Sequence, residues 1–372
     1  MIHRPMINRI LIIGGYGNFG SYIAKSLALD ANCQLIIGGR SLDKARTFVA
    51  GLDAMNPAEA IALDISNNFA AALASIKPNI VIHTSGPFQA QSYHVAVCCI
   101  NAKVHYIDLA DGREFVHGIQ SLQQQALRNN VIVISGASSV PGLTSAVIDH
   151  YADQFDLIDT LDYGITTAQK TTRGLATTAA ILSYTGRQFS TLINGTPSAI
   201  FGWQNLRVRR YKKLGWRLLA NCDIPDLALF PERYPQLKTI RFYAGLELPG
   251  IHLALWSLSW LVRFRFMTNL QRYAALLLKL SFLFDWLGSA SSAFHMQMSG
   301  TDNHGNAKSL TFELTARSGD GPYIPCMPAI LLTRKIAAGQ YDKVGAYPCI
   351  GLLSLTEYLD ALKPLAISWE FF

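Results

Sequence analysis

Several familiar signatures are missing from this sequence of 372 residues. Its six cysteines form no C-x-x-C pair, and neither they nor the nine histidines have the spacing of a metal site. The G-x-S-x-G, H-E-x-x-H and Walker motifs are absent, so nothing points to the corresponding hydrolases, zinc proteases or P-loop proteins. No apolar run is long enough to span a bilayer, and the one at the N-terminus is too short for a signal peptide. We therefore expect a reduced, cytoplasmic setting.

Charged residues are also sparse, at 15% of the chain, but the basic ones prevail and give a formal net charge of +7. This excess favours an anionic partner such as a dinucleotide phosphate or an acidic lipid surface. Apart from residues 207–213 the basic residues are scattered, so we expect no binding of nucleic acid. Half of the residues are hydrophobic, and this length and composition predict two or three domains with substantial cores.

The most informative stretch is ILIIGGYGNFG, residues 10–20. An apolar strand leads into G-x-G-x-x-G spacing, and a helical pattern follows over residues 21–29. In such a motif the glycines permit a tight turn, a close approach of backbone amides to a pyrophosphate and close packing of the helix. A structural glycine-rich turn would share the spacing, but the flanking strand and helix favour dinucleotide binding, with the cofactor contacts made by Gly15, Tyr16, Gly17, Asn18, Phe19 and Gly20.

The residues after the second predicted strand indicate which dinucleotide binds. An NAD site usually places an acidic side chain there, whereas this chain has Arg40, followed by Ser41 and Lys44. A guanidinium can bind a 2′-phosphate through two oxygens, so NADP(H) is favoured. Alternatively, these residues merely begin a solvated helix with Ser41 as its N-cap. Asp64 after the third strand either contacts the adenine amino group or caps the next turn.

Strands and helices alternate through the first 135 residues, which predicts a parallel, doubly wound α/β sheet of Rossmann type. Ligands of such sheets lie beyond the carboxyl ends of the strands. We therefore expect the loop after the fourth strand to border the cofactor through Ser85, Gly86 and Pro87. The predicted strands cover residues 10–13, 33–37, 60–63, 79–83, 104–108 and 131–135, and the helices 21–29, 41–52, 68–76, 93–101 and 114–129.

The alternating pattern ends near residues 136–143. Longer strands follow, including two that flank the turn-rich TDNHGN as a predicted hairpin, and they indicate an inserted α+β domain with a mixed sheet. We expect this domain to supply the substrate site and the interface of a homodimer. The predicted strands are 157–166, 205–211, 216–220, 239–243, 294–299 and 309–316, and two later helices are predicted at 329–338 and 354–362.

Residues 249–294 are unusually apolar and contain IHLALWSLSWLV and YAALLLKLSFLFDWLG. Arg, Lys and Asp interrupt both runs, so neither can span a bilayer. Three interpretations remain open: helices buried in the domain or in a dimer interface, a lid over an apolar substrate, and an amphipathic element in peripheral contact with a membrane surface.

Candidate catalytic residues follow the fifth strand. Tyr106, Asp111 and Arg113 are placed there by the topology, with Asp111 as a proton relay or amine partner and Arg113 as a clamp for a carboxylate or phosphate. The alternative is structural, with Arg113 paired to an acidic neighbour on a solvated helix.

Together, IIGGYGNFG, GGRS, HTSGPF, VHYIDLADGRE and VGAYPCIGLLSL resemble the saccharopine dehydrogenase-like, or saccharopine reductase-like, oxidoreductases, most strongly over residues 7–145. The resemblance implies a nucleotide-binding domain of residues 1–143 plus about 325–372, interrupted by a mixed-sheet domain of residues 144–324. It also implies cofactor roles for Gly15, Gly17, Gly20, Arg40 and Ser41, and for Gly86 and Pro87.

These observations predict an NADP(H)-dependent oxidoreductase that acts by hydride transfer on a small or lipid-like substrate. The alternative is a catalytically silent NADP(H)-binding protein that reports redox state to a partner. Neither the substrate nor the reaction direction follows from the sequence.

Overall fold

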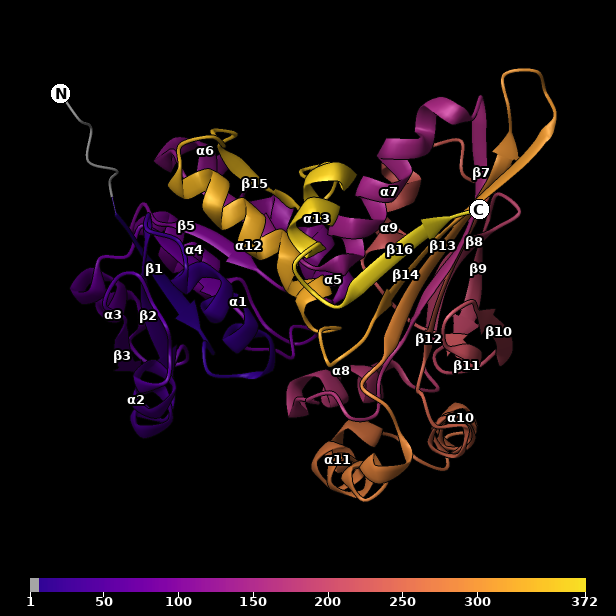
Figure 1. The fold of residues 1–372 in the computed structure, drawn as a ribbon, viewed down its shortest axis with the longest axis horizontal. Coiled ribbons are helices and arrows are strands. Elements are labelled where there is room, and N and C mark those ends of the chain that lie inside the picture. The colour runs from indigo at the N-terminus through magenta and orange to yellow at the C-terminus, as the bar shows by residue number, and fades with distance from the viewer. Residues whose placement is uncertain (1–6) are drawn as a thin grey trace. The chain divides into compact units, whose positions relative to one another are not determined.

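The computed structural model describes residues 7–372; residues 1–6, the start of the predicted nucleotide-binding domain, lie outside the described residues. The described chain divides into two compact units (Figure 1). The first unit contains the chain up to Leu143 together with Pro325–Leu353, and the second contains Thr144–Ile324 together with Ser354–Phe372.

The first unit is built on a sheet of seven parallel strands in the order β15-β6-β5-β4-β1-β2-β3. The chain order reverses between β1 and β4, which is where doubly wound sheets bind their ligands. The predicted α/β architecture is confirmed. The strands are β1 (Asn8–Ile13), β2 (Cys33–Gly39), β3 (Glu59–Ala62), β4 (Ile80–His83), β5 (His105–Asp108), β6 (Ile132–Ser135) and β15 (Gly345–Pro348).

Helices connect the strands of the first unit, and each helix buries apolar side chains on one face. In α1, for example, Ile23, Ala24 and Leu27 are buried, and α12 packs beside it, since the Arg334 guanidinium donates to the Ser26 carbonyl at 2.9 Å. The helix predicted over residues 114–129 is divided by a 3₁₀ segment at Ile119–Leu122. The helices are α1 (Asn18–Ala28), α2 (Leu42–Ala50), α3 (Phe69–Ile76), α4 (His94–Asn101), α5 (Arg113–Gly118), α6 (Gln123–Asn129) and α12 (Tyr323–Ala337).

The second unit contains a mixed seven-stranded sheet in the order β10-β11-β12-β7-β13-β14-β16. Its neighbouring strands are antiparallel except β12 and β7, and the predicted hairpin is formed by β13 and β14. A separate pair, β8 and β9, lies outside this sheet. The strands are β7 (Leu157–Thr166), β8 (Gln188–Ile193), β9 (Thr196–Phe201), β10 (Arg207–Tyr211), β11 (Gly215–Asn221), β12 (Thr239–Gly245), β13 (Ser292–Thr301), β14 (Ala307–Ala316) and β16 (Ile367–Phe371).

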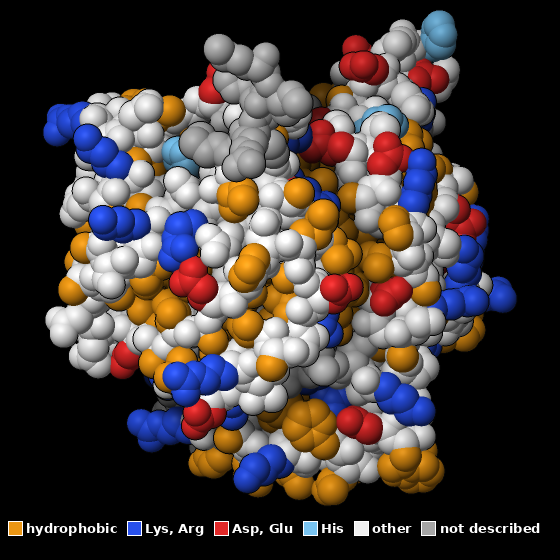
Figure 2. Space-filling model, turned by 60° about the vertical axis from the view of Figure 1, so that its left-hand side comes forward, with side chains coloured by type: hydrophobic (Ala, Val, Ile, Leu, Met, Phe, Trp, Pro, Cys, Tyr) orange, Lys and Arg blue, Asp and Glu red, His pale blue; other side chains and the backbone are white. Residues whose placement is uncertain are grey.

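Three helices of the second unit, α8, α10 and α11, share a small core of Ala179, Leu182, Val262, Leu270 and Ala274. Apolar side chains also lie on the surface among lysines and arginines at the lower end of Figure 2, the end at which Figure 1 shows α11. None of the helices in residues 7–372 is both long and apolar enough to cross a membrane. The helices are α7 (Thr144–Tyr151), α8 (Leu175–Tyr184), α9 (Asp226–Arg233), α10 (Pro249–Arg263), α11 (Ala274–Phe282) and α13 (Leu355–Leu362).

The predicted domain limits need one correction, at residues 354–372. These residues were assigned to the nucleotide-binding domain, but the structure places them in the second unit. The physical reason is strand pairing, because β16 runs antiparallel to β14 and completes that sheet, with Ile367 opposite Ala316. Only Pro325–Leu353 returns to the first unit.

Candidate functional site

The loop between β1 and α1 turns sharply at Gly14, whose φ is +77°. The sequence predicted this turn at Gly15, so the left-handed position lies one residue earlier than expected. A Cβ atom on Gly14 would lie 2.6 Å from Ser85 Oγ and 2.8 Å from Thr84 Oγ1. The loop after β4 therefore packs directly against the glycine-rich loop.

The glycines at the start of α1 leave its N-terminus accessible. A Cβ atom on Gly20 would lie 2.2 Å from the Gly14 carbonyl oxygen, so only glycine lets α1 begin against the loop. Gly17 is the N-cap of α1, no side chain caps the helix, and its first turn holds no acidic residue. The first N–H groups and the positive end of the helix dipole are thus open to an anion. This glycine cradle fits a dinucleotide pyrophosphate.

Asn18 and Phe19 occupy the first turn of α1. The buried Asn18 Oδ1 has no hydrogen-bond partner among residues 7–372, and such an acceptor is costly unless a ligand or water satisfies it. The Phe19 carbonyl accepts from Cys326 Sγ at 3.5 Å, which ties this turn to α12.

Tyr16 joins the glycine-rich loop to the end of β2. A Cβ atom on Gly39 would lie 2.5 Å from the Tyr16 ring, and the Ser41 backbone N–H donates to the Tyr16 hydroxyl at 3.0 Å. These contacts fix the position of Arg40, which lies between Gly39 and Ser41. A shallow depression beside them is lined by Tyr16, Asp43, Lys44, Thr47 and Phe48.

Both alternatives weighed for this region are compatible with the structure. Ser41 caps α2, since its Oγ accepts from the Lys44 backbone N–H at 3.4 Å, while Arg40 and Lys44 remain exposed. Asp64 closes its own turn, where it accepts from the Ser66 backbone N–H at 3.0 Å. This bond is the main cause of its lowered pKa, with smaller contributions that include the charge of Arg40.

The loop after β4 is held by hydrogen bonds to backbone atoms. Thr84 Oγ1 donates to the Ile13 carbonyl at 2.8 Å, and Gln91 Nε2 donates to the carbonyls of Ser85 and Pro87 at 2.8 and 3.0 Å. The peptide between Gly86 and Pro87 is cis. Ser85, Gly86 and Pro87 are therefore presented by a rigid loop next to the glycine-rich loop.

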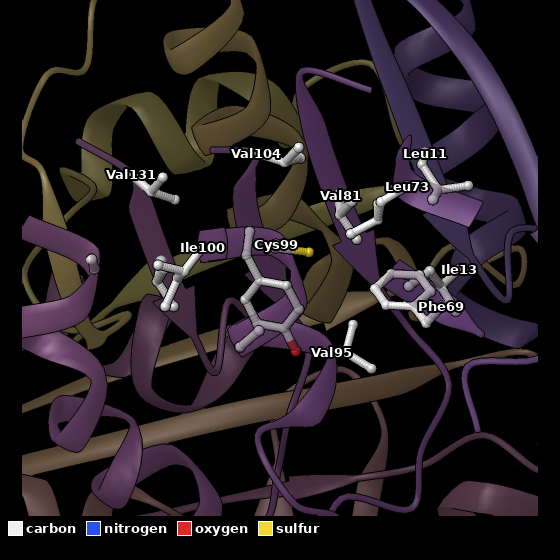
Figure 3. Packing of buried hydrophobic residues seen from close by; sticks show 14 of the residues in the cluster. Leu11, Ile13, Phe69, Leu73, Val81, Val95, Cys99, Ile100, Val104 and Val131 are labelled. Atoms are coloured by element: carbon white, nitrogen blue, oxygen red, sulfur yellow. The ribbon is translucent and has the colours of Figure 1, made fainter. Parts of the chain in front are cut away.

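Tyr106 does not occupy the position predicted for a catalytic residue. It is fully buried and belongs to the hydrophobic core of the first unit, part of which Figure 3 shows. Its hydroxyl lies 3.0 Å from Nδ1 of the buried His83. Tyr106 shares this core with Val95 and Cys99 of α4 and Ala126 of α6, whereas the ligands of such sheets lie beyond the strand ends. We therefore correct the prediction that Tyr106 contacts a ligand.

Asp111 and Arg113 lie beyond the end of β5, as predicted, and both side chains are half-buried. Asp111 Oδ1 accepts from Gln89 Nε2 at 3.1 Å, and burial raises the pKa of Asp111 above its ordinary value. Gln89 follows the loop after β4, so this bond brings Asp111 toward the loop expected at the cofactor. Arg113 is the first residue of α5, directly after its N-cap Gly112.

Three residues of this site were not singled out from the sequence. Gly14 could have been suspected, since it precedes the motif directly. The role of Thr84 depends on how the loops after β1 and β4 pack together, and that of Gln91 on how its own loop folds back on itself. The sequence carries no local signal for either.

Comparison with known proteins agrees with this geometry. Residues 10–134 match the family model of the saccharopine dehydrogenase NADP binding domain, which confirms NADP(H) as the cofactor of the first unit. No curated protein sequence matches the chain. Apo saccharopine dehydrogenase (L-Glu forming) from Saccharomyces cerevisiae shares the fold, with a TM-score of 0.69, 11% identity, and 98% of this chain and 100% of that chain covered.

Two further solved structures are less similar. A mutant meso-DAP dehydrogenase from Clostridium tetani has a TM-score of 0.49 and 12% identity, with 96% of this chain and 98% of that chain covered. An amine dehydrogenase from Mycobacterium smegmatis has a TM-score of 0.48 and 10% identity, with coverage of 93% and 96%. Over residues 10–134, the chain is thus similar to the NADP binding domain of saccharopine dehydrogenase.

Proposed function

We propose that the protein transfers a hydride between NADP(H) and a small or lipid-like substrate that contains a C=N, C=O or C=C bond. The observation that carries this proposal is the convergence of the loops after β1, β2 and β4 at the point where the strand order reverses. The glycine cradle, the end of β2 and the rigid loop after β4 each suit a different part of one dinucleotide.

Each group of predicted cofactor residues takes one task in this proposal. Gly15, Gly17 and Gly20 let the pyrophosphate approach the N-terminus of α1. Arg40 and Lys44 supply positive charge to the 2′-phosphate, and a guanidinium can bind two of its oxygens at once. The loop of Ser85, Gly86 and Pro87 borders the ribose and nicotinamide, and Asp64 remains a candidate for the adenine.

The bound cofactor supplies the hydride, so the protein must orient the substrate and manage one proton. We assign the proton to Asp111, whose raised pKa lets it hold a proton closer to neutral pH than an exposed aspartate would. Arg113 would bind an anionic group of the substrate and hold the reacting bond in place.

A paired titration tests the cofactor assignment. The purified protein is titrated with NADPH and NADH, and the series is repeated with Arg40→Ala. We expect NADPH to bind more tightly in the wild type and the preference to fall by about tenfold or more without the guanidinium. Arg46→Ala is the matched control, because it removes an exposed arginine from α2, the helix that follows Arg40. An unchanged preference in Arg40→Ala would contradict the role of this residue.

Turnover separates the proposal from the alternative of a silent NADP(H)-binding protein. NADPH oxidation is followed with carbonyl, imine and enoyl compounds, for the wild type and for Asp111→Asn. We expect the variant to bind NADPH normally and to lose activity by about 10²-fold or more, as expected for a proton-transfer group. Tight binding of NADPH without turnover of any compound would favour the silent protein.

A further inference from the structure

More than half of the large hydrophobic side chains that are exposed in residues 7–372 belong to one short segment, residues 253–287. The most exposed are Phe266, at 78%, and Trp286, at 76%. We call this surface the apolar helical face. It comprises Leu253, Leu261, Phe264, Phe266, Tyr273, Leu276, Leu280, Phe282, Leu283, Phe284, Trp286 and Leu287.

Helix α10 buries polar as well as apolar residues and leaves some leucines on the surface. Its buried residues are His252, Ser259 and Val262, whereas Leu253 and Leu261 are exposed. Both buried polar side chains bond to nearby backbone groups, since His252 Nδ1 accepts from the Leu246 backbone N–H at 3.3 Å and Ser259 Oγ donates to the Trp256 carbonyl at 2.6 Å. A surface helix of a soluble protein normally directs its apolar residues to the core. The exposed leucines of α10 are therefore available for contact with a partner outside the unit.

The exposure is not caused by a poorly packed segment. The end of α11 is tied to the rest of the second unit through Gln169, whose Nε2 donates to the Ser281 carbonyl at 2.8 Å and to Asp285 Oδ1 at 3.0 Å. Asp285 Oδ1 also pairs with Arg173 at 2.5 Å. The apolar helical face therefore belongs to a segment that hydrogen bonds and an ion pair hold in place.

The charges around the apolar helical face distinguish between two partners that could cover it, a second copy of this chain and an anionic lipid surface. Residues 249–288 contain four basic side chains, all exposed, and one acidic side chain, Asp285, which already pairs with Arg173. A second copy of this chain would oppose one positive face to another, which is unfavourable. An anionic lipid surface would instead neutralise the basic residues while its acyl boundary buries the apolar ones. The four are Arg263, Arg265, Arg272 and Lys279.

We propose that the apolar helical face docks the protein peripherally on a bilayer that contains anionic lipids. The aromatic side chains enter the boundary between headgroups and acyl chains, and the surrounding arginines and lysine contact lipid phosphates. Figure 2 shows the corresponding mixture of orange and blue side chains at its lower end. This inference does not depend on the cofactor or on the reaction.

Co-sedimentation with vesicles tests the proposal directly. Full-length protein is mixed with vesicles of phosphatidylcholine alone and of phosphatidylcholine with phosphatidylglycerol. We expect partitioning onto the mixed vesicles, a loss of about tenfold or more in the double variant Phe266→Ser/Trp286→Ser, and weaker binding at high salt. The matched control is Val208→Ser/Trp216→Ser, which replaces similarly exposed residues, 63% and 65%, on β10 and β11; it should bind like the wild type.

A second double variant tests the charge argument. Arg265→Glu/Arg272→Glu should lose the preference for anionic vesicles while it keeps the cofactor affinity of the wild type. Light scattering of each protein without lipid gives the oligomeric state. The proposal is overturned if the wild type binds neither kind of vesicle, or if it forms a dimer that Phe266→Ser/Trp286→Ser dissociates without any effect on vesicle binding.

Discussion

The two units use their sheets in different ways. In the first unit parallel strands end at one edge, where backbone groups and glycines form the proposed cofactor site, and side chains such as Tyr106 fill the core. In the second unit a mostly antiparallel sheet supports helices that keep large apolar side chains exposed. The proposed site of the first unit therefore relies on glycines, whose missing side chains leave room at its loops. The second unit is instead distinguished by the large apolar side chains that it exposes on its surface.

A buried carboxyl group in each unit makes the comparison measurable. Asp108 Oδ1 accepts three hydrogen bonds, from the backbone N–H groups of Ala110 and Gly136 and from Ser135 Oγ, whereas Asp226 Oδ2 accepts two, from the hydroxyls of Thr144 and Tyr163. Burial raises the pKa of Asp108 to about 6 and that of Asp226 to about 7. Fewer and weaker donors thus leave the carboxylate of the second unit less well stabilised.

The largest expected effect is therefore the change that replacing Asp226 makes to the pH dependence of stability. The folded state keeps the two carboxyl protons to higher pH than the unfolded chain does, so the contribution of these two groups to the free energy of unfolding falls as the pH rises from about 4 to 7. His83, His252 and His295, whose pKa values are lowered by burial, contribute in the opposite direction. The decline through Asp226 amounts to at most about 4 kcal/mol. Urea unfolding at several pH values should show that Asp226→Asn changes the pH dependence of the free energy of unfolding more than Asp108→Asn does. The same pH dependence in wild type and Asp226→Asn would contradict the assignment.

A pair of glycines gives the next largest effect. Gly20→Ala would place a Cβ atom 2.2 Å from the Gly14 carbonyl oxygen, so we expect a loss of about 3 kcal/mol in the free energy of unfolding and weaker NADPH binding. In the second unit, nothing lies within 4 Å of a Cβ on Gly250, and Gly250→Ala should be neutral or slightly stabilising. Urea unfolding and a fluorescence titration with NADPH measure both. Equal effects of Gly20→Ala and Gly250→Ala would contradict the expected difference between the two units.

Replacing two serine N-caps should have the smallest effect on stability. It should also separate helix capping from cofactor binding. Ser354 caps α13 in the second unit, where its Oγ accepts from the Glu357 backbone N–H at 3.2 Å, and Ser41 caps α2 in the first. Ser354→Ala should cost about 1 kcal/mol of stability and leave NADPH affinity unchanged. Ser41→Ala should cost no more stability, because its bond is longer at 3.4 Å, but it should weaken NADPH binding relative to NADH. A loss of NADPH affinity in Ser354→Ala would argue against this division.

The first unit was largely predictable because its signals are local. Each of its first six strands is a short apolar run followed by a helix, and the cofactor residues adjoin those strands in sequence. The errors arose where a neighbour in space decided the outcome. The positive φ lies at Gly14 rather than Gly15, at the residue against which the loop after β4 packs.

The second unit was less predictable because its pairings join distant segments. β16 was not recognised as a strand, since five residues carry too weak a pattern and their partner β14 lies far away in the chain. Nor could the packing of α10 be derived, because the helix buries His252 and Ser259 beside Val262 while Leu253 and Leu261 stay exposed. Sequence patterns identify an amphipathic helix but do not say which partner receives its apolar side.

The pairing of the two late strands has a consequence for synthesis of the chain. β15 covers the edge of β6 in one sheet, and β16 covers the edge of β14 in the other. On the ribosome both edges stay open until residues 345–371 have emerged, so neither sheet is complete during most of translation. The same short stretch adds the last strand to both sheets, and a premature stop before Gly345 would leave β6 and β14 as edge strands.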